Sequence, residues 1–328
     1  MRVNSVLNFN IQQSEQLKST KKYNCLNSDV FIKTKPSFKS NIEFDDQSYN
    51  SFINWANSTD FLNNISSDMQ NLKGELIGEG AEGYIYEVPG TDNWVLKEAK
   101  NTFLLSYTQK KATTEPAKDI IPSMNIGQRI GRIFVPYDEN KAQVFDVMKK
   151  QTGIPLGIGN DYTGCPTEES IETHLNTLKI LSEAPQSTYD KLIRDIKQVH
   201  KQGYLFDSYN PNNFLYNQAR KSINFVDIGN IFHRNESQFG DILYALLDTT
   251  FYQTLNSNKP DEQSAIETSR EYAKNIVNKY IKSMQKEKVE FDYTDLFIKL
   301  TKTDLLVRAL NCKSNDDISK KLRELKVI

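Results

Sequence analysis

The sequence of 328 residues is poor in the residue types on which several classes of protein depend. Its three cysteines, Cys25, Cys165 and Cys312, are far apart and form no CxxC pair. A disulfide framework and a zinc site are therefore not expected, and a reducing compartment is consistent with the sequence. Three histidines are too few for a site built from several histidine ligands. No apolar run approaches the roughly 18 residues of a membrane helix, so integral membrane contact is not expected.

Neither sign of charge is in excess. The chain has 41 Lys and Arg residues against 42 Asp and Glu residues, a formal net charge of −1. Because binding to a phosphate backbone needs a basic surplus, nucleic acid is not expected as a partner.

Residues 1–70 form a polar region rich in Asn, Ser, Gln and Lys, without a sustained period of 2 or 3.6. This composition predicts a partly disordered leader. The region lacks the apolar core of a classical signal peptide, which leaves a disordered tail or an address for a dedicated bacterial export system. Within it, the aromatic and apolar residues of 43–70 predict a short helix docked on the main domain.

The rest of the chain changes from strand patterns to helix patterns. Within residues 71–150, the stretch that starts at Leu72, "LKGELIGEGAEGYIYEVPGTDNWVLKEAK", indicates strand, glycine-rich turn, strand, turn and strand. Residues 151–328 contain "TEESIETHLNTLKILSEA" and "STYDKLIRDIKQVHKQG", with apolar residues at helical spacing. This order predicts an α+β fold.

The first candidate site is a glycine-rich turn followed by a lysine. Gly78, Gly80 and Gly83 form a GxGxxG pattern, which is weak alone because a Rossmann turn shares it. Here "YIYEV" continues as an alternating strand, which favours a β-hairpin whose glycines let backbone N–H groups approach phosphates. Lys97 follows in "WVLK", inside an apolar strand, where it is placed to hold the phosphates of ATP. Each piece alone would be an ordinary hairpin or lysine, but together they predict phosphate binding.

The second candidate site lies in "GYLFDSYNPNNFLYNQARKSINFVDIGN". Asn213 at the end of a polar loop and Asp227 at the start of D-x-G offer an amide and a carboxylate oxygen, which are ligands that Mg²⁺ accepts beside substrate phosphates. Taken alone, "NPNN" would indicate a turn, and "DIG" would indicate no particular structure or site. Their order after Lys97 favours a phosphotransferase.

Residues 72–245 resemble the protein-kinase superfamily, and in particular the small kinases that enteric bacteria inject through type III secretion. The resemblance rests on "IGEGAEGYIYEV", "WVLK", "GYLFDSYNPNNFLY" and "FVDIGNIF". It implies a bilobal α+β fold of the protein-kinase type, with ATP and Mg²⁺ as cofactors. It also implies a Ser/Thr protein kinase secreted into the host cell cytoplasm, acting on a host protein with or without a host activator. The implied roles are covering of ATP by Gly78, Gly80 and Gly83, phosphate pairing by Lys97, and Mg²⁺ binding by Asn213 and Asp227.

The catalytic loop departs from the family pattern. Aligned without gaps, the family's H-R-D falls on Phe206-Asp207-Ser208, which places Ser208 at the position of the catalytic aspartate. With the frame shifted by one residue, Asp207 is the base and Asn212 the metal ligand. A serine does not accept a proton at neutral pH as a carboxylate does, so Asp207 is the predicted base.

Two further features depart from the family. Glu115 lies where the acidic partner of Lys97 belongs, but Pro116 would put it at the start of a helix, and Asp119 is the alternative. The string "FGDILYALLD" resembles the kinase helix whose aspartate braces the catalytic loop, which implies a structural role for Asp241. Asp241 comes only 14 positions after Asp227, without an A-P-E string, so the activation segment is much shortened. An active enzyme would then be constitutive or switched on by a partner.

Three other functions stay open beside the protein kinase. A pseudokinase would bind nucleotide or a host protein without catalysis, consistent with Ser208 and Pro116. A small-molecule phosphotransferase of the aminoglycoside-kinase type would also lack A-P-E. Nucleotidyl transfer is compatible with the same fold. The sequence identifies neither the substrate nor the oligomeric state.

Overall fold

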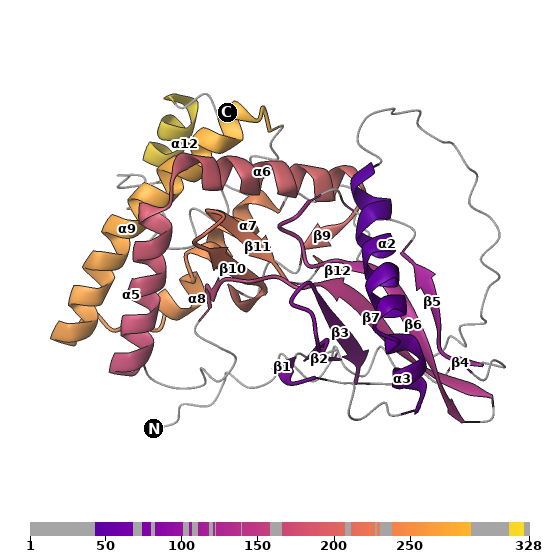
Figure 1. Cartoon of the computed structure of the whole chain (residues 1–328). Coiled ribbons are helices and arrows are strands. Elements are labelled where there is room, and N and C mark those ends of the chain that lie inside the picture. The colour runs from indigo at the N-terminus through magenta and orange to yellow at the C-terminus, as the bar shows by residue number, and fades with distance from the viewer. Residues whose placement is uncertain are drawn as a thin grey trace, which may run out of the picture. The chain divides into compact units, whose positions relative to one another are not determined.

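The computed structural model describes most of the chain from residue 43 onwards (Figure 1). The described residues are 43–67, 74–79, 83–100, 105–106, 111–117, 121, 123–138, 140–157, 166–206, 211–226, 228–229, 238–289 and 315–324. Within them, no helix is both long and apolar enough to cross a membrane.

An antiparallel seven-stranded sheet forms the first part of the fold. Its strands follow the order β1-β2-β3-β7-β6-β5, and β4 also pairs with β7. The strands are β1 (Leu76–Glu79), β2 (Gly83–Glu87), β3 (Trp94–Ala99), β4 (Leu105–Ser106), β5 (Thr113–Pro116), β6 (Arg129–Asp138) and β7 (Lys141–Lys149).

Two helices, α2 (Glu43–Ser58) and α3 (Phe61–Ser67), cover one face of this sheet. Phe52 of α2 is fully buried, and its ring meets that of Trp94 edge-on at a centroid distance of 5.5 Å. Leu96 and Phe145 belong to the same buried cluster. Side chains alternate between the faces of a strand, so the neighbours of Leu96 on β3 point to the other face. The helix predicted within residues 43–70 is confirmed, and it packs with the sheet, while residues 1–42 lie outside the described residues.

The second part of the fold is mainly helical. Its helices are α5 (Glu168–Glu183), α6 (Gln186–Lys201), α7 (Phe239–Leu246), α8 (Thr249–Tyr252), α9 (Pro260–Lys286) and α12 (Asn315–Glu324). The hydroxyl of Thr167 caps α5 by accepting the N–H of Ser170, and α6 is followed by Gly203 at a φ of 81°, which a glycine adopts without strain.

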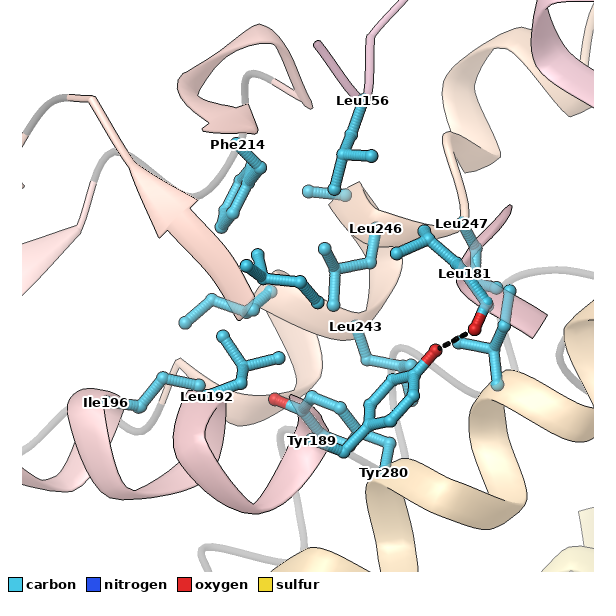
Figure 2. Close-up of a cluster of buried hydrophobic side chains, with 14 of the residues drawn as sticks. Leu156, Leu181, Tyr189, Leu192, Ile196, Phe214, Leu243, Leu246, Leu247 and Tyr280 are labelled. Carbon is cyan, nitrogen blue, oxygen red and sulfur yellow. Dashed lines mark hydrogen bonds between the residues drawn. The ribbon is translucent and has the colours of Figure 1, made fainter. Parts of the chain in front are cut away.

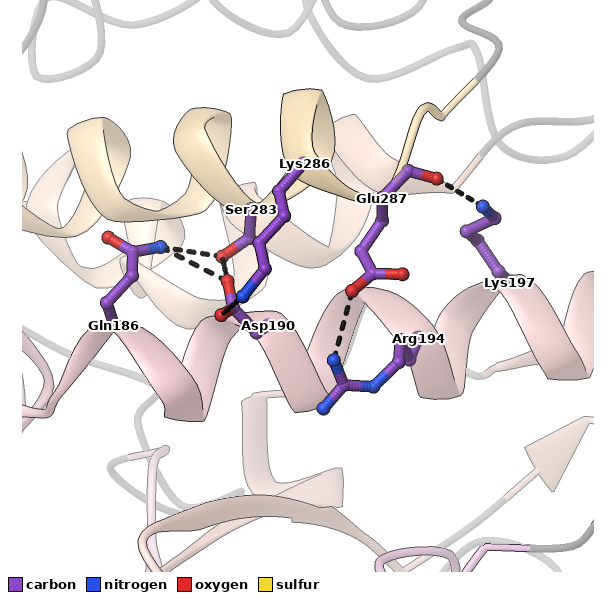
Figure 3. Close-up of polar contacts among 7 residues, drawn as sticks. All are labelled: Gln186, Asp190, Arg194, Lys197, Ser283, Lys286 and Glu287. Atoms are coloured by element: carbon purple, nitrogen blue, oxygen red, sulfur yellow. Dashed lines mark hydrogen bonds and ion pairs between the residues drawn. The ribbon is translucent and has the colours of Figure 1, made fainter.

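A buried cluster holds α5, α6, α7, α8 and α9 together (Figure 2). Tyr189 lies at its centre and donates a hydrogen bond of 2.7 Å to the carbonyl oxygen of Leu181, so its polar end is satisfied inside the core. Polar contacts also join α6 to α9 (Figure 3). Asp190 accepts hydrogen bonds from Ser283 and Lys286, and Arg194 pairs with Glu287 at 3.0 Å.

Short strands lie between α6 and α7. They are β9 (Leu205–Phe206), β10 (Phe214–Asn217), β11 (Ser222–Phe225) and β12 (Ile228–Gly229), with the 3₁₀ turn η1 (Pro211–Asn213) ahead of β10. β10 also pairs with β8 (Ile154–Pro155), the strand that follows the large sheet. A sheet-forming part therefore precedes a helical part, which confirms the predicted α+β class.

Residues 123–128 connect the sheet to the helical part. Asp195 of α6 accepts hydrogen bonds from Ser123 at 2.7 Å and Asn125 at 2.8 Å. Ile126 makes a parallel bridge with Phe225 of β11. Residues 123–128, just before β6, are thus held against β11, the strand that ends two residues before residue 227.

Candidate functional site

The predicted glycine-rich turn is a β-hairpin. Strands β1 and β2 pair antiparallel, with Gly78 opposite Ile85 and Glu79 opposite Tyr84. Gly80 lies outside the described residues, with the rest of the turn at 81–82. The chain therefore continues from the turn into a strand, as predicted, and not into the helix of a Rossmann turn.

Gly83 and Gly78, the two described glycines of the motif, differ in whether the packing around them leaves room for a side chain. A Cβ atom on Gly83 would overlap the carbonyl oxygen of Glu98 on β3, so glycine is needed there for β2 to pack closely on β3. A Cβ atom on Gly78 would meet only the side chain of Ile85, at an ordinary 3.6 Å. Packing explains Gly83 and leaves Gly78 free for another role.

Lys97 lies on β3, directly opposite Ile85 of the hairpin. On its other side, it is opposite Asp146 of β7. Its side chain is half-buried and, by the alternation of the strand, points away from the face that α2 and α3 cover. The predicted phosphate-binding lysine therefore shares a strand pair with the glycine-rich hairpin.

A row of charged residues crosses the sheet beside Lys97. Asp146 is opposite Arg132 of β6, and the carboxylate of Asp146 accepts a hydrogen bond of 2.7 Å from Nε of Arg132. Arg129 lies 3.6 Å from the same carboxylate. The acid on the strand next to Lys97 is thus Asp146, which sequence reasoning missed. Its signal was a charged residue at an alternate position of the apolar strand "VFDVM".

The predicted position of Glu115 at the start of a helix is wrong. Glu115 is exposed on β5, the edge strand, opposite Arg132. Three strand spacings separate its backbone from that of Lys97, roughly 14 Å. Two threonines precede it and Pro116 follows, and these residues favour an extended edge strand over a helix. The alternative acid, Asp119, lies outside the described residues.

The loop that should carry the base and the metal ligands is described at its ends. Phe206 pairs with Ile228, so the residues that precede Asp207 and follow Asp227 are neighbours in β9 and β12. At the other end, the carbonyl oxygen of Asn213 accepts a hydrogen bond of 3.0 Å from the N–H of Val226. Asp207, Ser208 and Asp227 themselves lie outside the described residues.

Asn212 and Asn213 are half-buried in η1. A Cβ atom on Gly157 would overlap the side-chain oxygen of Asn212, so the chain after β8 packs closely against this turn. The amide and carboxylate types of Asn213 and Asp227 suit Mg²⁺, and the backbone pairing brings Asn213 beside Val226, the residue before Asp227. In the part of the chain that the structure describes, no group of three or more His, Cys, Asp or Glu residues could hold a metal ion.

Asp195, the residue of α6 that binds the connecting segment 123–128, has a shifted pKa. Burial raises the pKa of Asp195, and the hydrogen bonds from Asn125 and Ser123 act in the opposite direction. Asp195 therefore stabilises the connection through hydrogen bonds and not through an exposed charge. Asp241, for which the kinase resemblance implies a structural role, is buried in the first turn of α7.

No protein-family model matches the chain, and no curated protein matches it. Two solved structures are similar to this chain, both at low sequence identity. The LegK7 effector kinase of Legionella pneumophila is 11% identical over 85% of this chain and 70% of its own, with a TM-score of 0.35. The pseudokinase domain of BIR2, an immune regulator of the RLK/Pelle family, is 12% identical over 71% of this chain and 88% of its own, with a TM-score of 0.31. The strand order, the glycine-rich hairpin and the position of Lys97 give the chain a protein-kinase-like α+β fold.

Proposed function

We propose that the protein is an ATP- and Mg²⁺-dependent phosphotransferase, a Ser/Thr protein kinase that a bacterial export system delivers into host cells to act on host proteins. One observation carries the proposal. Lys97 stands on the strand paired with the glycine-rich hairpin, while Asn213 is hydrogen-bonded to the residue that precedes Asp227.

The proposed chemistry depends on position and charge more than on covalent steps. Lys97 pairs with the phosphates of ATP, and the hairpin from Gly78 to Gly83 lies over them. Asn213 and Asp227 would hold Mg²⁺, and the bound ion would offset the negative charge of the transferred phosphoryl group. Asp207 accepts the proton of the substrate hydroxyl group and orients its oxygen.

A pseudokinase is the second candidate, because Glu115, the predicted acidic partner of Lys97, lies on the edge strand β5, three strands away from β3. Among the described residues between β3 and β6 there is no helix, and Glu115 lies on a strand beside Arg132. A protein of this kind would bind nucleotide, or a host protein, and transfer nothing.

Nucleotide binding and transfer are separated by two measurements on the same samples. Saturating Mg²⁺–ATP should raise the melting temperature of the wild type, since a ligand at a hundred times its Kd stabilises a fold by about 2.7 kcal/mol. Asn213→Ala should lower the dependence of this shift on Mg²⁺. Absence of any shift with ATP, with or without Mg²⁺, would contradict nucleotide binding.

The position of the base is tested by two neighbouring substitutions. Asp207→Ala should abolish phosphoryl transfer and keep the thermal shift, whereas Ser208→Ala should keep both. Loss of transfer only in Ser208→Ala would assign the role to the other frame. A thermal shift without transfer in the wild type, also after addition of eukaryotic cell lysate, would favour the pseudokinase.

A further inference from the structure

Gln238 lies at the start of α7 and binds the short strand that leads into the catalytic loop. It is buried, and both ends of its side-chain amide are bound to the backbone of Phe206 on β9. The N–H of Phe206 donates a hydrogen bond of 2.8 Å to Oε1 of Gln238. Nε2 of Gln238 donates a hydrogen bond of 2.7 Å to the carbonyl oxygen of Phe206. The side chain therefore satisfies the backbone of β9 as a neighbouring strand would.

The helices around Gln238 hold it in place. The carbonyl oxygen of Phe239, the next residue, accepts a hydrogen bond of 2.8 Å from the hydroxyl group of Tyr280 on α9. The ring of Phe239 meets that of His200 on α6 edge-on, at a centroid distance of 5.5 Å. Nε2 of His200 also lies 3.3 Å from Oε1 of Gln238. The amide that binds β9 is thus connected to the core formed by α6, α7 and α9.

Phe206 lies next to two predicted site residues. It directly precedes Asp207, and it pairs with Ile228, the residue that follows Asp227. Its ring stacks on that of Phe225 at a centroid distance of 3.9 Å. The carbonyl oxygen of Phe206 belongs to the planar peptide unit that contains the backbone nitrogen of Asp207. Any movement of this unit therefore moves the backbone that carries the predicted base.

We propose that Gln238 is a positioning residue for phosphoryl transfer, because its amide fixes the peptide unit between Phe206 and Asp207. This inference rests on the proposed function, in which Asp207 accepts the proton of the substrate hydroxyl group. The kinase resemblance implies such a bracing role for Asp241, and Gln238 lies about one helical turn before it. A side chain that lacks either the donor or the acceptor cannot make both contacts.

Gln128 provides a matched control. Its buried amide makes the same pair of contacts to one backbone residue, accepting the N–H of Ile121 at 2.6 Å and donating to its carbonyl oxygen at 2.5 Å. Gln238→Met and Gln128→Met each remove two such hydrogen bonds and keep a side chain of similar size. Both variants should therefore lower the melting temperature by similar amounts, while Gln238→Met alone alters the contacts of the residue before Asp207.

Hydrogen exchange measured by mass spectrometry tests the positioning without any need for catalysis. The backbone amide of Phe206, read from overlapping peptides, should exchange at least about tenfold faster in Gln238→Met than in the wild type. In Gln128→Met its exchange should change less than about twofold. Unchanged exchange in Gln238→Met, or equal acceleration in both variants, would overturn the proposal. Since this measurement is independent of transfer, its failure and a failed kinase assay remain distinguishable.

The consequence for transfer is tested with γ-labelled ATP at a temperature where all variants are folded. Gln238→Met should lower kcat about tenfold or more, since small displacements of a reacting group cost one to two orders of magnitude in rate. Its KM for ATP should change less than about twofold, because Lys97 and the glycine-rich hairpin are not altered. Gln128→Met should keep both constants near those of the wild type. Equal kcat values for the two variants, or a loss in Gln238→Met confined to KM, would overturn the proposal.

Discussion

The contact between α6 and α9 allows a prediction whose magnitudes follow from burial. The side chain of Asp190 is 8% exposed and accepts hydrogen bonds from Ser283 at 2.7 Å and from Lys286 at 2.5 Å (Figure 3). Gln186 donates to Ser283 at 2.7 Å, and Ser283 is fully buried. The side chain of Lys286 is 62% exposed.

The exposed fractions of Ser283 and Lys286 indicate which of these two partners of Asp190 contributes more to the stability of the fold. An ion pair with a largely hydrated ammonium group contributes less than about 1 kcal/mol to the free energy of unfolding. Lys286→Ala should therefore lower that free energy by less than this amount. Ser283→Ala removes a buried donor to a carboxylate and should cost about 1–2 kcal/mol. Asp190→Ala leaves the Ser283 hydroxyl group without its acceptor and should cost about 2–3 kcal/mol.

Urea denaturation of the single and double variants measures these costs, with Lys282→Ala as the control for a substitution at an exposed lysine of α9. The coupling energy between Asp190 and Ser283 should exceed that between Asp190 and Lys286. Burial alone would raise the pKa of Asp190, but the hydrogen bonds from Lys286, Ser283 and Gln186 hold it below its usual value. The stabilisation is therefore present above the ordinary aspartate pKa and is lost as the pH falls below it. A cost for Lys286→Ala equal to that for Ser283→Ala would refute the reasoning.

Three further predictions concern other buried positions. Gly83→Ala should destabilise the sheet, because the added methyl group overlaps a backbone oxygen of β3, whereas Gly78→Ala should not; equal melting temperatures would contradict this. Tyr189→Phe should lower the free energy of unfolding in urea by about 1–2 kcal/mol, because the buried hydrogen bond from the Tyr189 hydroxyl group to the Leu181 carbonyl oxygen is lost, and no change would contradict the assigned bond. Burial raises the pKa of Asp248 to about 6, so the folded protein holds this proton more tightly than the unfolded chain. Asp248→Asn, which keeps a residue suited to the φ of 44°, should therefore be more stable than the wild type by about 3 kcal/mol above pH 6. This difference should shrink as the pH falls and vanish below about pH 3. A wild type that is the more stable above pH 6 would instead indicate an ion pair with His174.

Local sequence patterns were sufficient for the hairpin and the main helices. The residues after Gly83 alternate like a strand, and Lys97 follows within a second strand, so their pairing across a short turn could be predicted. The glycine after α6 likewise marked the end of that helix. In each case the signal and the structure lie within a few residues of each other.

Contacts between distant segments could not be predicted in this way. The row that places Asp146 between Lys97 and Arg132 depends on the order of β3, β7 and β6, which no local pattern contains. The position of Glu115 was mistaken because the family resemblance was preferred over a local signal. The sequence "TTEP" favoured an edge strand on its own chemistry.

The central claim is tested most directly by transfer of label from γ-labelled ATP in the presence of Mg²⁺, with and without eukaryotic cell lysate. Wild type is compared with Lys97→Ala, and Lys141→Ala serves as the control for loss of an exposed lysine from the same sheet. The account predicts label on the protein or on a lysate protein with wild type and Lys141→Ala, and none above background with folded Lys97→Ala. Undiminished labelling with Lys97→Ala would contradict the assignment of this strand as the phosphate-binding element.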